Sequence, residues 1–168
     1  MFFTPLVLLA LAAVGLADVP AGYKTVYITS NVNAKFVVVP KAAKSGSTVV
    51  VQTLANTAAQ QWYIKAGGTS KIQLAGTTLC LDAGAKTNWK DMANIYVNDC
   101  DDSADGQKWD VKADGRIGVA ASSPEECIDL QYMRATNNNP VGLYSCAGLG
   151  GAGAGDKGIN WPLADATS

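Results

Sequence analysis

The sequence contains no histidine, only two glutamates and few charged residues of either sign, 16% in all. Without histidine there is no Ser-His-Asp or Cys-His catalytic unit, no HExxH zinc site and no His-ligated metal. The two glutamates, Glu125 and Glu126, are adjacent, which does not suit a pair of glutamates placed for acid–base catalysis. We therefore expect a protein that is not an enzyme, with no catalytic residues, no metal site and no cofactor.

A basic excess is also missing. The chain has 13 Lys and Arg against 14 Asp and Glu, a formal net charge of -1. Proteins that bind nucleic acid use basic side chains to neutralise phosphates, so we expect no nucleic-acid partner. The hydrophobic fraction of 48% together with this low net charge excludes an intrinsically disordered chain.

Only one long hydrophobic run occurs, and it lies at the start of the chain. Residues 1–17 resemble a secretory signal peptide, with an apolar run at Leu6–Leu16 and small residues Gly15 and Ala17 at the spacing of a cleavage site. The run is too short to span a bilayer, which needs roughly twenty apolar residues. We expect a mature protein that begins near Asp18, is secreted to the extracellular space and has no membrane span.

The chain has four cysteines, and export changes what they predict. An even number of cysteines in a secreted chain favours disulfides, and the CxxC spacing of a zinc site is absent. Three pairings are possible. The sequential pairing of Cys80 with Cys100 and Cys127 with Cys146 gives two loops of nearly equal length, and it is the pairing we expect.

The two cysteine loops are part of an internal repeat with a period of about 47 residues. Trp62 and Trp109 follow the same period, and it indicates three copies of one unit. The copies cover about 18–66, 67–113 and 114–168.

Short β-like runs fill each copy. They are rich in Val, Ile or Tyr and are bounded by turn-forming residues. The first run of the second copy is Lys71–Leu74, and the last run of the third copy is Asn160–Leu163. No segment after residue 17 has a convincing helical period. A copy of about 47 residues cannot easily bury a core alone, so we expect the copies to share one. The pattern predicts an all-β fold with twelve strands, a barrel or sandwich with threefold repetition.

Two motifs recur at matching places in the repeat. Gln-x-Trp stands at 60–62 and 107–109, and Cys-Leu-Asp or Cys-Ile-Asp stands at 80–82 and 127–129. This combination resembles the ricin B-type lectins, a family of carbohydrate-binding modules. The resemblance implies a β-trefoil of three pseudo-symmetric repeats over 18–168, tryptophans in the core, and glycans, polysaccharides or a glycoprotein as partners.

The family resemblance also implies a shallow sugar site in each copy. A carboxylate follows the first cysteine, an aromatic side chain precedes the second cysteine by two residues, and an Asn or Gln lies near Gln-x-Trp. The polar groups form hydrogen bonds with the hydroxyls of a sugar, and the aromatic ring stacks on its apolar C–H face. The third copy matches best, with Asp129, Tyr144 and backbone at Gly142, and with Asn160 or Asp156 in place of the missing Asn-Gln pair.

The second copy keeps Asp82 and Gln107, but Asn98 holds the position of the aromatic residue. Stacking on a sugar there requires Trp89 or Tyr96 to fold over the site.

The first copy lacks the cysteines. Allowing a short gap, Phe36 and Leu54 stand near the two cysteine positions, Val38 stands at the carboxylate position and Gln52 at the aromatic position. We therefore expect no sugar site in this copy.

These observations favour a secreted, non-catalytic lectin that recognises galactose-type or related glycans through one or two shallow sites, one in the third copy and, where there are two, the other in the second copy. The alternative is a β-trefoil proteinase inhibitor that acts through exposed loops, because a fold does not determine a function. A hydrolase with paired aspartates is a third hypothesis, but nothing in the sequence places two of them across a cleft. Retention on a sugar column would separate the lectin from the other two.

Overall fold

The computed structural model describes residues 18–146 and 155–166, and the predicted signal peptide at 1–17 lies outside this range. The described chain is all-β, as predicted, and it contains no helix long and apolar enough to cross a membrane. Its strands are β1 (Lys24–Ile28), β2 (Phe36–Pro40), β3 (Ser47–Thr53), β4 (Trp62–Ile64), β5 (Gly68–Ser70), β6 (Gln73–Leu74), β7 (Leu79–Asp82), β8 (Tyr96–Asp99), β9 (Trp109–Val111), β10 (Ile117–Val119), β11 (Glu126–Leu130), β12 (Val141–Ser145) and β13 (Leu163–Asp165).

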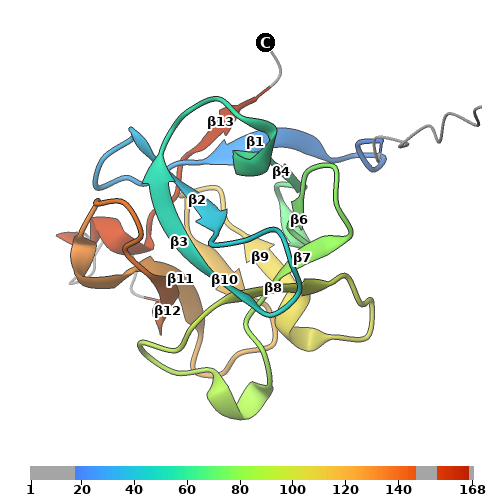
Figure 1. Ribbon diagram of the computed structural model, residues 1–168. Helices are drawn as coiled ribbons and strands as arrows, with labels where there is room; N and C mark the ends of the chain where they lie inside the picture. Colours follow the sequence, from blue (N-terminus) through green and yellow to red (C-terminus); the bar gives the residue numbers. More distant parts are fainter. Residues whose placement is uncertain (1–17, 147–154, 167–168) are drawn as a thin grey trace, which may run out of the picture.

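Three antiparallel hairpins alternate with barrel strands along the chain, which is the β-trefoil arrangement (Figure 1). The hairpins are β2–β3, β7–β8 and β11–β12. In the barrel, β1 pairs with β13 and β4, β4 with β6, and β9 with β5 and β10. The hairpins also contact one another, since β3 pairs with β8 and two isolated bridges join 50 to 140 and 94 to 142.

Two of the predicted strands differ from those observed. Where one strand was predicted at Lys71–Leu74, the structure has two short strands, β5 and β6. β5 pairs with β9 and β6 pairs with β4, so the described residues contain thirteen strands and not the twelve predicted. The final strand begins at Leu163, because Pro162 has no N–H to donate and the N–H of Trp161 donates to Gly115.

Short 3-10 helices connect several strands. They are η1 (Ala58–Gln60), η2 (Lys86–Asn88), η3 (Asp105–Gln107), η4 (Gln131–Met133) and η6 (Lys157–Ile159). η1, η3 and η6 each end two residues before a tryptophan, so they are equivalent elements of the three copies.

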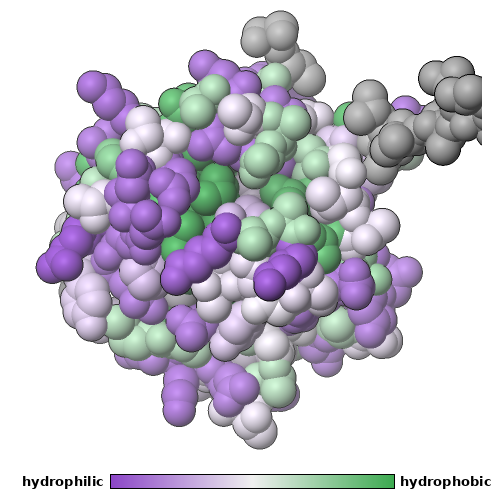
Figure 2. All heavy atoms as spheres, in the orientation of Figure 1, coloured by the Kyte–Doolittle hydropathy of each residue, from purple (hydrophilic) through white to green (hydrophobic). Residues whose placement is uncertain are grey.

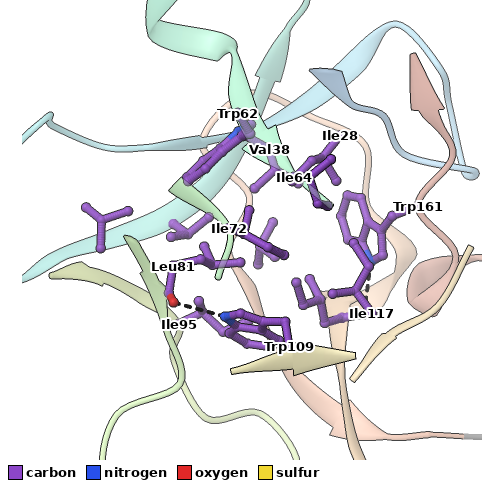
Figure 3. Close-up of a cluster of buried hydrophobic side chains, with 14 of the residues drawn as sticks. Ile28, Val38, Trp62, Ile64, Ile72, Leu81, Ile95, Trp109, Ile117 and Trp161 are labelled. Carbon is purple, nitrogen blue, oxygen red and sulfur yellow. Dashed lines mark hydrogen bonds between the residues drawn. The ribbon is translucent and has the colours of Figure 1, made fainter. Parts of the chain in front are cut away.

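A tryptophan anchors each copy in the shared core (Figure 3). All three are at most 1% exposed, and every indole N–H donates to a backbone carbonyl at 2.9 Å: Trp62 to Val38, Trp109 to Leu81 and Trp161 to Ile128. The tryptophans therefore hold the hairpins to the barrel. They are core residues, as the family resemblance implies.

This equivalence corrects the strand register expected for the first copy. In the second and third copies, the carbonyl that accepts the indole N–H belongs to the residue between the first cysteine and the aspartate. In the first copy this carbonyl belongs to Val38, so the next residue, Val39, stands at the carboxylate position. Val37, and not Phe36, stands at the first cysteine position. Gln52 pairs with Val37 and so lies where it was expected. The first copy still has no carboxylate at this position.

Both predicted disulfides are formed, Cys80–Cys100 and Cys127–Cys146. Each covalently links the first strand of a hairpin to the residue that follows the second. On the loop-entropy model, each stabilises the fold by about 3 kcal/mol. In the first copy, Val37 and Leu54 pack in a small apolar cluster at the same place.

The surface is mixed in character. Figure 2 shows hydrophobic side chains in the middle of one face, near β2, surrounded by hydrophilic ones. On the face drawn, the hydrophobic groups lie between polar neighbours and form no broad continuous area.

Candidate functional site

Two equivalent aspartates stand at the carboxylate positions of the cysteine-containing hairpins. Asp82 ends β7 and Asp129 lies in β11, and they are 8% and 6% exposed. A glycine of the neighbouring 3-10 helix lies against each carboxylate. A Cβ at Gly106 would lie 2.6 Å from Oδ1 of Asp82, and one at Gly158 would lie 2.6 Å from Oδ1 of Asp129. Glycine therefore permits the helix to approach the carboxylate in both copies.

In the second copy the carboxylate is held by internal hydrogen bonds. The backbone N–H of Gly84 donates to Oδ1 of Asp82 at 2.7 Å. Asn98 and Gln107 donate to Oδ2 from their amide groups at 2.9 and 3.2 Å. The predicted residues of the second copy are thus neighbours, and their polar groups contact one another.

The glutamine of Gln-x-Trp also has a structural role. Gln107 is 1% exposed; its amide N–H₂ donates to the carbonyl of Asp99 at 3.0 Å, and its amide oxygen accepts the N–H of Asp101 at 2.9 Å. Gln60 makes the corresponding pair of hydrogen bonds in the first copy. The glutamine therefore fixes the end of a hairpin to the 3-10 helix.

A cavity of about 400 Å³ lies beside Asp82. Trp89 lines it and donates its indole N–H to the carbonyl of Gly84 at 3.1 Å. Of the two aromatic residues considered for the second copy, Trp89 lines this cavity and Tyr96 does not. Lys86 lines it as well and brings a positive charge to the site.

In the third copy the carboxylate of Asp129 receives no hydrogen bond from the described residues. Ile159 occupies the place of the motif glutamine and Tyr144 the place of the second-copy asparagine, and neither donates to it. The third donor in the second copy is the backbone N–H of Gly84. Its counterpart here, the N–H of Gln131, donates to the carbonyl of Pro140 instead. A buried carboxylate is thus left available for a ligand.

The surroundings of Asp129 are unfavourable to its negative charge. Burial, and then the nearby carboxylates of Asp156 and Asp91, raise the pKa of the carboxyl group to about 7. Asp91 is fixed close by, since its Oδ1 accepts the N–H and the hydroxyl of Ser145 at 2.7 and 2.8 Å. Asp129 is therefore partly protonated near neutral pH.

Asp129 lies in a cavity of about 550 Å³, which we call the aspartate cup. The cup lies beside the β11–β12 hairpin, and these two strands are adjacent at the lower left of Figure 1. Its lining residues are Met92, Asp129, Tyr132, Met133, Tyr144 and Asp156.

The rim of the cup is apolar, aromatic and exposed. Five large hydrophobic residues are exposed in the described chain, and four of them line the cup: Met92 at 38%, Tyr132 at 75%, Met133 at 49% and Tyr144 at 39%. The backbone of three of these residues is left-handed, with φ of 67° at Met92, 60° at Tyr132 and 49° at Met133. This conformation is uncommon for residues other than glycine and is often found where a protein binds a ligand.

The other two residues predicted for the third copy do not line the cup. Gly142 pairs with Asp129 across the hairpin, but a Cβ on it would lie 2.5 Å from the carbonyl oxygen of Ala93. Asn160 donates its side-chain amide to the carbonyl of Asp114 at 2.6 Å, and the Gly115 backbone packs against its amide group.

Sequence reasoning did not find Met92, Tyr132 or Met133. Met92 belongs to the second copy and reaches the third because its N–H donates to the carbonyl of Leu143 at 2.8 Å. Tyr132 and Met133 lie in η4, the turn after the strand of Asp129, where the second copy has the smaller or charged pair 85–86. That difference in an otherwise regular repeat was the available signal.

The position of Asn160 leads to a first prediction. Asn160→Ala should leave ligand affinity at the cup within about twofold, because the side chain bonds to Asp114 and does not line the cup. The substitution should lower stability by about 1 kcal/mol through the lost hydrogen bond. Titration calorimetry and urea unfolding on the same samples would check both. A tenfold loss of affinity would place Asn160 in the site after all.

The threefold barrel, the tryptophan anchors and the paired aspartate positions define a β-trefoil of the Gln-x-Trp type. The family model of the ricin-type beta-trefoil lectin domain matches the chain twice, over residues 24–117 and 69–162. The chain therefore belongs to this family. A search of curated proteins finds no match.

Solved structures share the fold at low sequence identity. A designed threefold symmetric protein, ThreeFoil, is 19% identical with a TM-score of 0.69, over 84% of this chain and 98% of that one. The earthworm R-type lectin C-half, in complex with GalNAc, is 16% identical (TM-score 0.63, coverage 84% and 98%). The Vibrio vulnificus hemolysin/cytolysin β-trefoil lectin, with N-acetyl-D-lactosamine bound, is 12% identical (TM-score 0.63, coverage 88% and 98%). The chain also matches 17% of a mosquitocidal holotoxin. At these identities the likeness shows the fold alone.

Proposed function

We propose that this protein is a secreted, non-catalytic lectin that binds galactose-type or related glycans in the aspartate cup. The observation that carries the proposal is the carboxylate of Asp129, 6% exposed and without a donor from the described residues, in a cavity with an aromatic rim. A sugar supplies what this site lacks, namely directional hydroxyl donors beside an apolar face.

The chemistry of the cup suits such a ligand. Asp129 and Asp156 accept hydrogen bonds from sugar hydroxyls, and bonds to charged acceptors are stronger than those between neutral groups. Tyr144 and Tyr132 offer ring surfaces for the C–H face of the sugar. The cup is of the size of a small-molecule site and is exposed to solvent on its rim.

Relatives support the choice of ligand class. The earthworm lectin is described in complex with GalNAc and the Vibrio lectin with N-acetyl-D-lactosamine. Both sugars contain a galactose-type unit. The two disulfides suit an oxidising compartment and support the proposal that the protein is secreted.

The second copy is the weaker of the two proposed sites. Asp82, Asn98 and Gln107 bond to one another, so a sugar would compete with the contacts they already make. Trp89 offers a ring there in place of the missing aromatic. We therefore propose one principal site, which gives binding without agglutination of cells by a monomer, because cross-linking needs at least two sites.

The proposal predicts that Tyr144→Ala weakens glycan binding about tenfold or more, since the ring would lose its stacking contact with the sugar. A glycan array would identify the ligand, and titration calorimetry would measure the change. Tyr23→Ala is the matched control because Tyr23 lines a different cavity, next to Lys24 and Asp165. It should bind as the wild type does.

Two results would contradict the proposal. Equal binding by Tyr144→Ala and the wild type would place the sugar outside the cup. Folded wild-type protein that binds no glycan on the array would reject the lectin, and proteinase inhibition would then be assayed.

A further inference from the structure

The charge of the aspartate cup is one-sided. Among the described residues, two charged ones line it, Asp129 and Asp156, and neither Lys nor Arg does. Asp91 adds a third carboxylate within electrostatic reach. The described salt bridges of the chain lie elsewhere, among residues 71, 102, 105, 108, 110, 112, 114, 116 and 125.

The equivalent cavity of the second copy lacks this excess of negative charge. Ala104 occupies the position of Asp156, two residues before the glycine of the 3-10 helix. Lys86 lines that cavity with Asp82 and Asp105, and Asp105 is paired with a lysine at 2.7 Å. The acidic character of the aspartate cup is therefore specific to the third copy and does not follow from the fold.

Two carboxylates that share a cavity without a cation repel one another, and the one that is buried also loses its hydration. Asp129 is more than nine-tenths buried, lines the cavity and receives no hydrogen bond from the described chain. A ligand that is positively charged and donates hydrogen bonds would relieve both costs. A neutral sugar would relieve only the second.

The rim also favours a cation. Tyr132 and Tyr144 both line the cup with exposed side chains, and aromatic faces attract ammonium groups at distances up to about 6 Å. The thioethers of Met92 and Met133 add polarisable, uncharged surface. A sugar amine has this combination of a positive charge on an otherwise apolar C–H face.

We propose that the aspartate cup selects sugar residues with a free, protonated amino group over their N-acetylated and neutral counterparts. This inference rests on the proposed function and names the ligand class of the same site. Asp129 and Asp156 bind the ammonium group, and the two tyrosines cover the ring.

The proton on Asp129 then competes with the ligand. The carboxyl group shares the cup with Asp156 and with the phenols of Tyr132 and Tyr144, and Asp91 lies nearby; the charged groups that shift its pKa are both carboxylates. Because its pKa is about 7, the affinity for an amine should fall as the pH decreases from about 7 to about 5, where Asp129 takes up a proton.

The test compares sugars that differ only at the amine. The methyl glycosides of galactosamine and glucosamine are titrated against those of N-acetylgalactosamine and N-acetylglucosamine, near neutral pH, by NMR chemical-shift mapping. We expect each amine to bind about tenfold more tightly than its N-acetyl partner. Asp156→Asn keeps the oxygen that accepts the Gly158 N–H but removes one charge, and it should reduce this preference several-fold.

The control is Asp165→Asn. Asp165 ends β13 and lines the cavity of Tyr23, outside both proposed sites, and its substitution should leave the amine preference unchanged. Tyr144→Ala should weaken both members of a pair.

The outcomes separate this inference from the proposed function. N-acetylated sugars that bind as well as the amines, with a loss in Tyr144→Ala, would overturn the inference and keep the lectin. Amine affinity that is the same in Asp156→Asn, Tyr144→Ala and the wild type would indicate non-specific attraction to an acidic surface and would also overturn the inference. Folded protein that binds none of the four sugars, and no other glycan on the array, would overturn both.

Discussion

Replacing Asp129 with asparagine is expected to abolish glycan binding at the aspartate cup and, at the same time, to make the protein more stable at neutral pH. Asparagine has nearly the same shape but carries no charge. The variant therefore removes the acceptor proposed to bind the ligand together with the cost of burying it.

The sign of the stability effect follows from the pKa. The pKa of Asp129 is about 7 in the folded protein, against an ordinary value of 3.8. Between about pH 4 and pH 7 the folded state therefore binds more protons than the unfolded state, and the free energy of unfolding falls as the pH rises through this window. The shift corresponds to about 4 kcal/mol above pH 7 as an upper bound. An unpaired asparagine amide offsets part of this, so we expect a gain of about 1–3 kcal/mol.

Urea unfolding of both proteins at about pH 5 and about pH 8 measures the effect as a difference between variant and wild type. The raised pKa of Glu126, caused first by burial and then by Asp91, is common to both and cancels. The advantage of Asp129→Asn should be larger at the higher pH. Asp114→Asn is the control and should lower the free energy of unfolding. The hydrogen bond from Arg116 holds the pKa of Asp114 below its usual value, so this carboxylate stabilises the fold. Equal stability differences at the two pH values would contradict the assignment of a raised pKa to Asp129.

A residue whose replacement stabilises the fold but removes ligand binding is kept for function. The second copy shows the alternative arrangement, in which Asp82 is held by three donors and contributes to the internal structure. The third copy has Ile159 in place of the glutamine that would have satisfied its carboxylate. The two copies thus share a backbone and differ in whether the aspartate is free to accept from a ligand.

Much of the fold could be predicted because it depends on local and periodic features. The disulfide pairing was predicted from two loops of nearly equal length. The repeat with its strand-like runs predicted an all-β fold with threefold repetition, and the family resemblance implied that this fold is a β-trefoil. Asp129 stands two residues after Cys127 and Tyr144 two residues before Cys146. Because a disulfide joins these cysteines, both residues lie on one hairpin, where Tyr144 is opposite Cys127. Repetition in the sequence becomes repetition in space when the copies share one core.

The rest depended on contacts that no spacing encodes. The first copy was misaligned by one residue because Val37, Val38 and Val39 are alike in type, and only the indole of Trp62 distinguishes the carbonyl that it contacts. Met92 reaches the cup through a backbone contact between copies. Asn160 lies close to the site in sequence, but its amide has a better partner at the neighbouring turn.

The glutamine of Gln-x-Trp provides the second large effect, and the repeat supplies its control. Gln107→Leu should destabilise the protein by about 3 kcal/mol, because the buried side chain satisfies the Asp99 carbonyl, the Asp101 N–H and the Asp82 carboxylate together. Gln60→Leu should cost about 2 kcal/mol, since this residue makes the same two backbone hydrogen bonds but contacts no carboxylate.

Urea unfolding of the two variants therefore isolates the part that belongs to the carboxylate. A larger loss for Gln107→Leu would mean that Asp82 depends on the glutamine for its burial, as the hydrogen bonds of the second copy indicate. A loss no larger than that of Gln60→Leu would mean that the remaining donors, Gly84 and Asn98, suffice to hold it. In that case the missing glutamine of the third copy could not explain why Asp129 is free, and the exchange of asparagine for Tyr144 would have to carry the difference between the two sites.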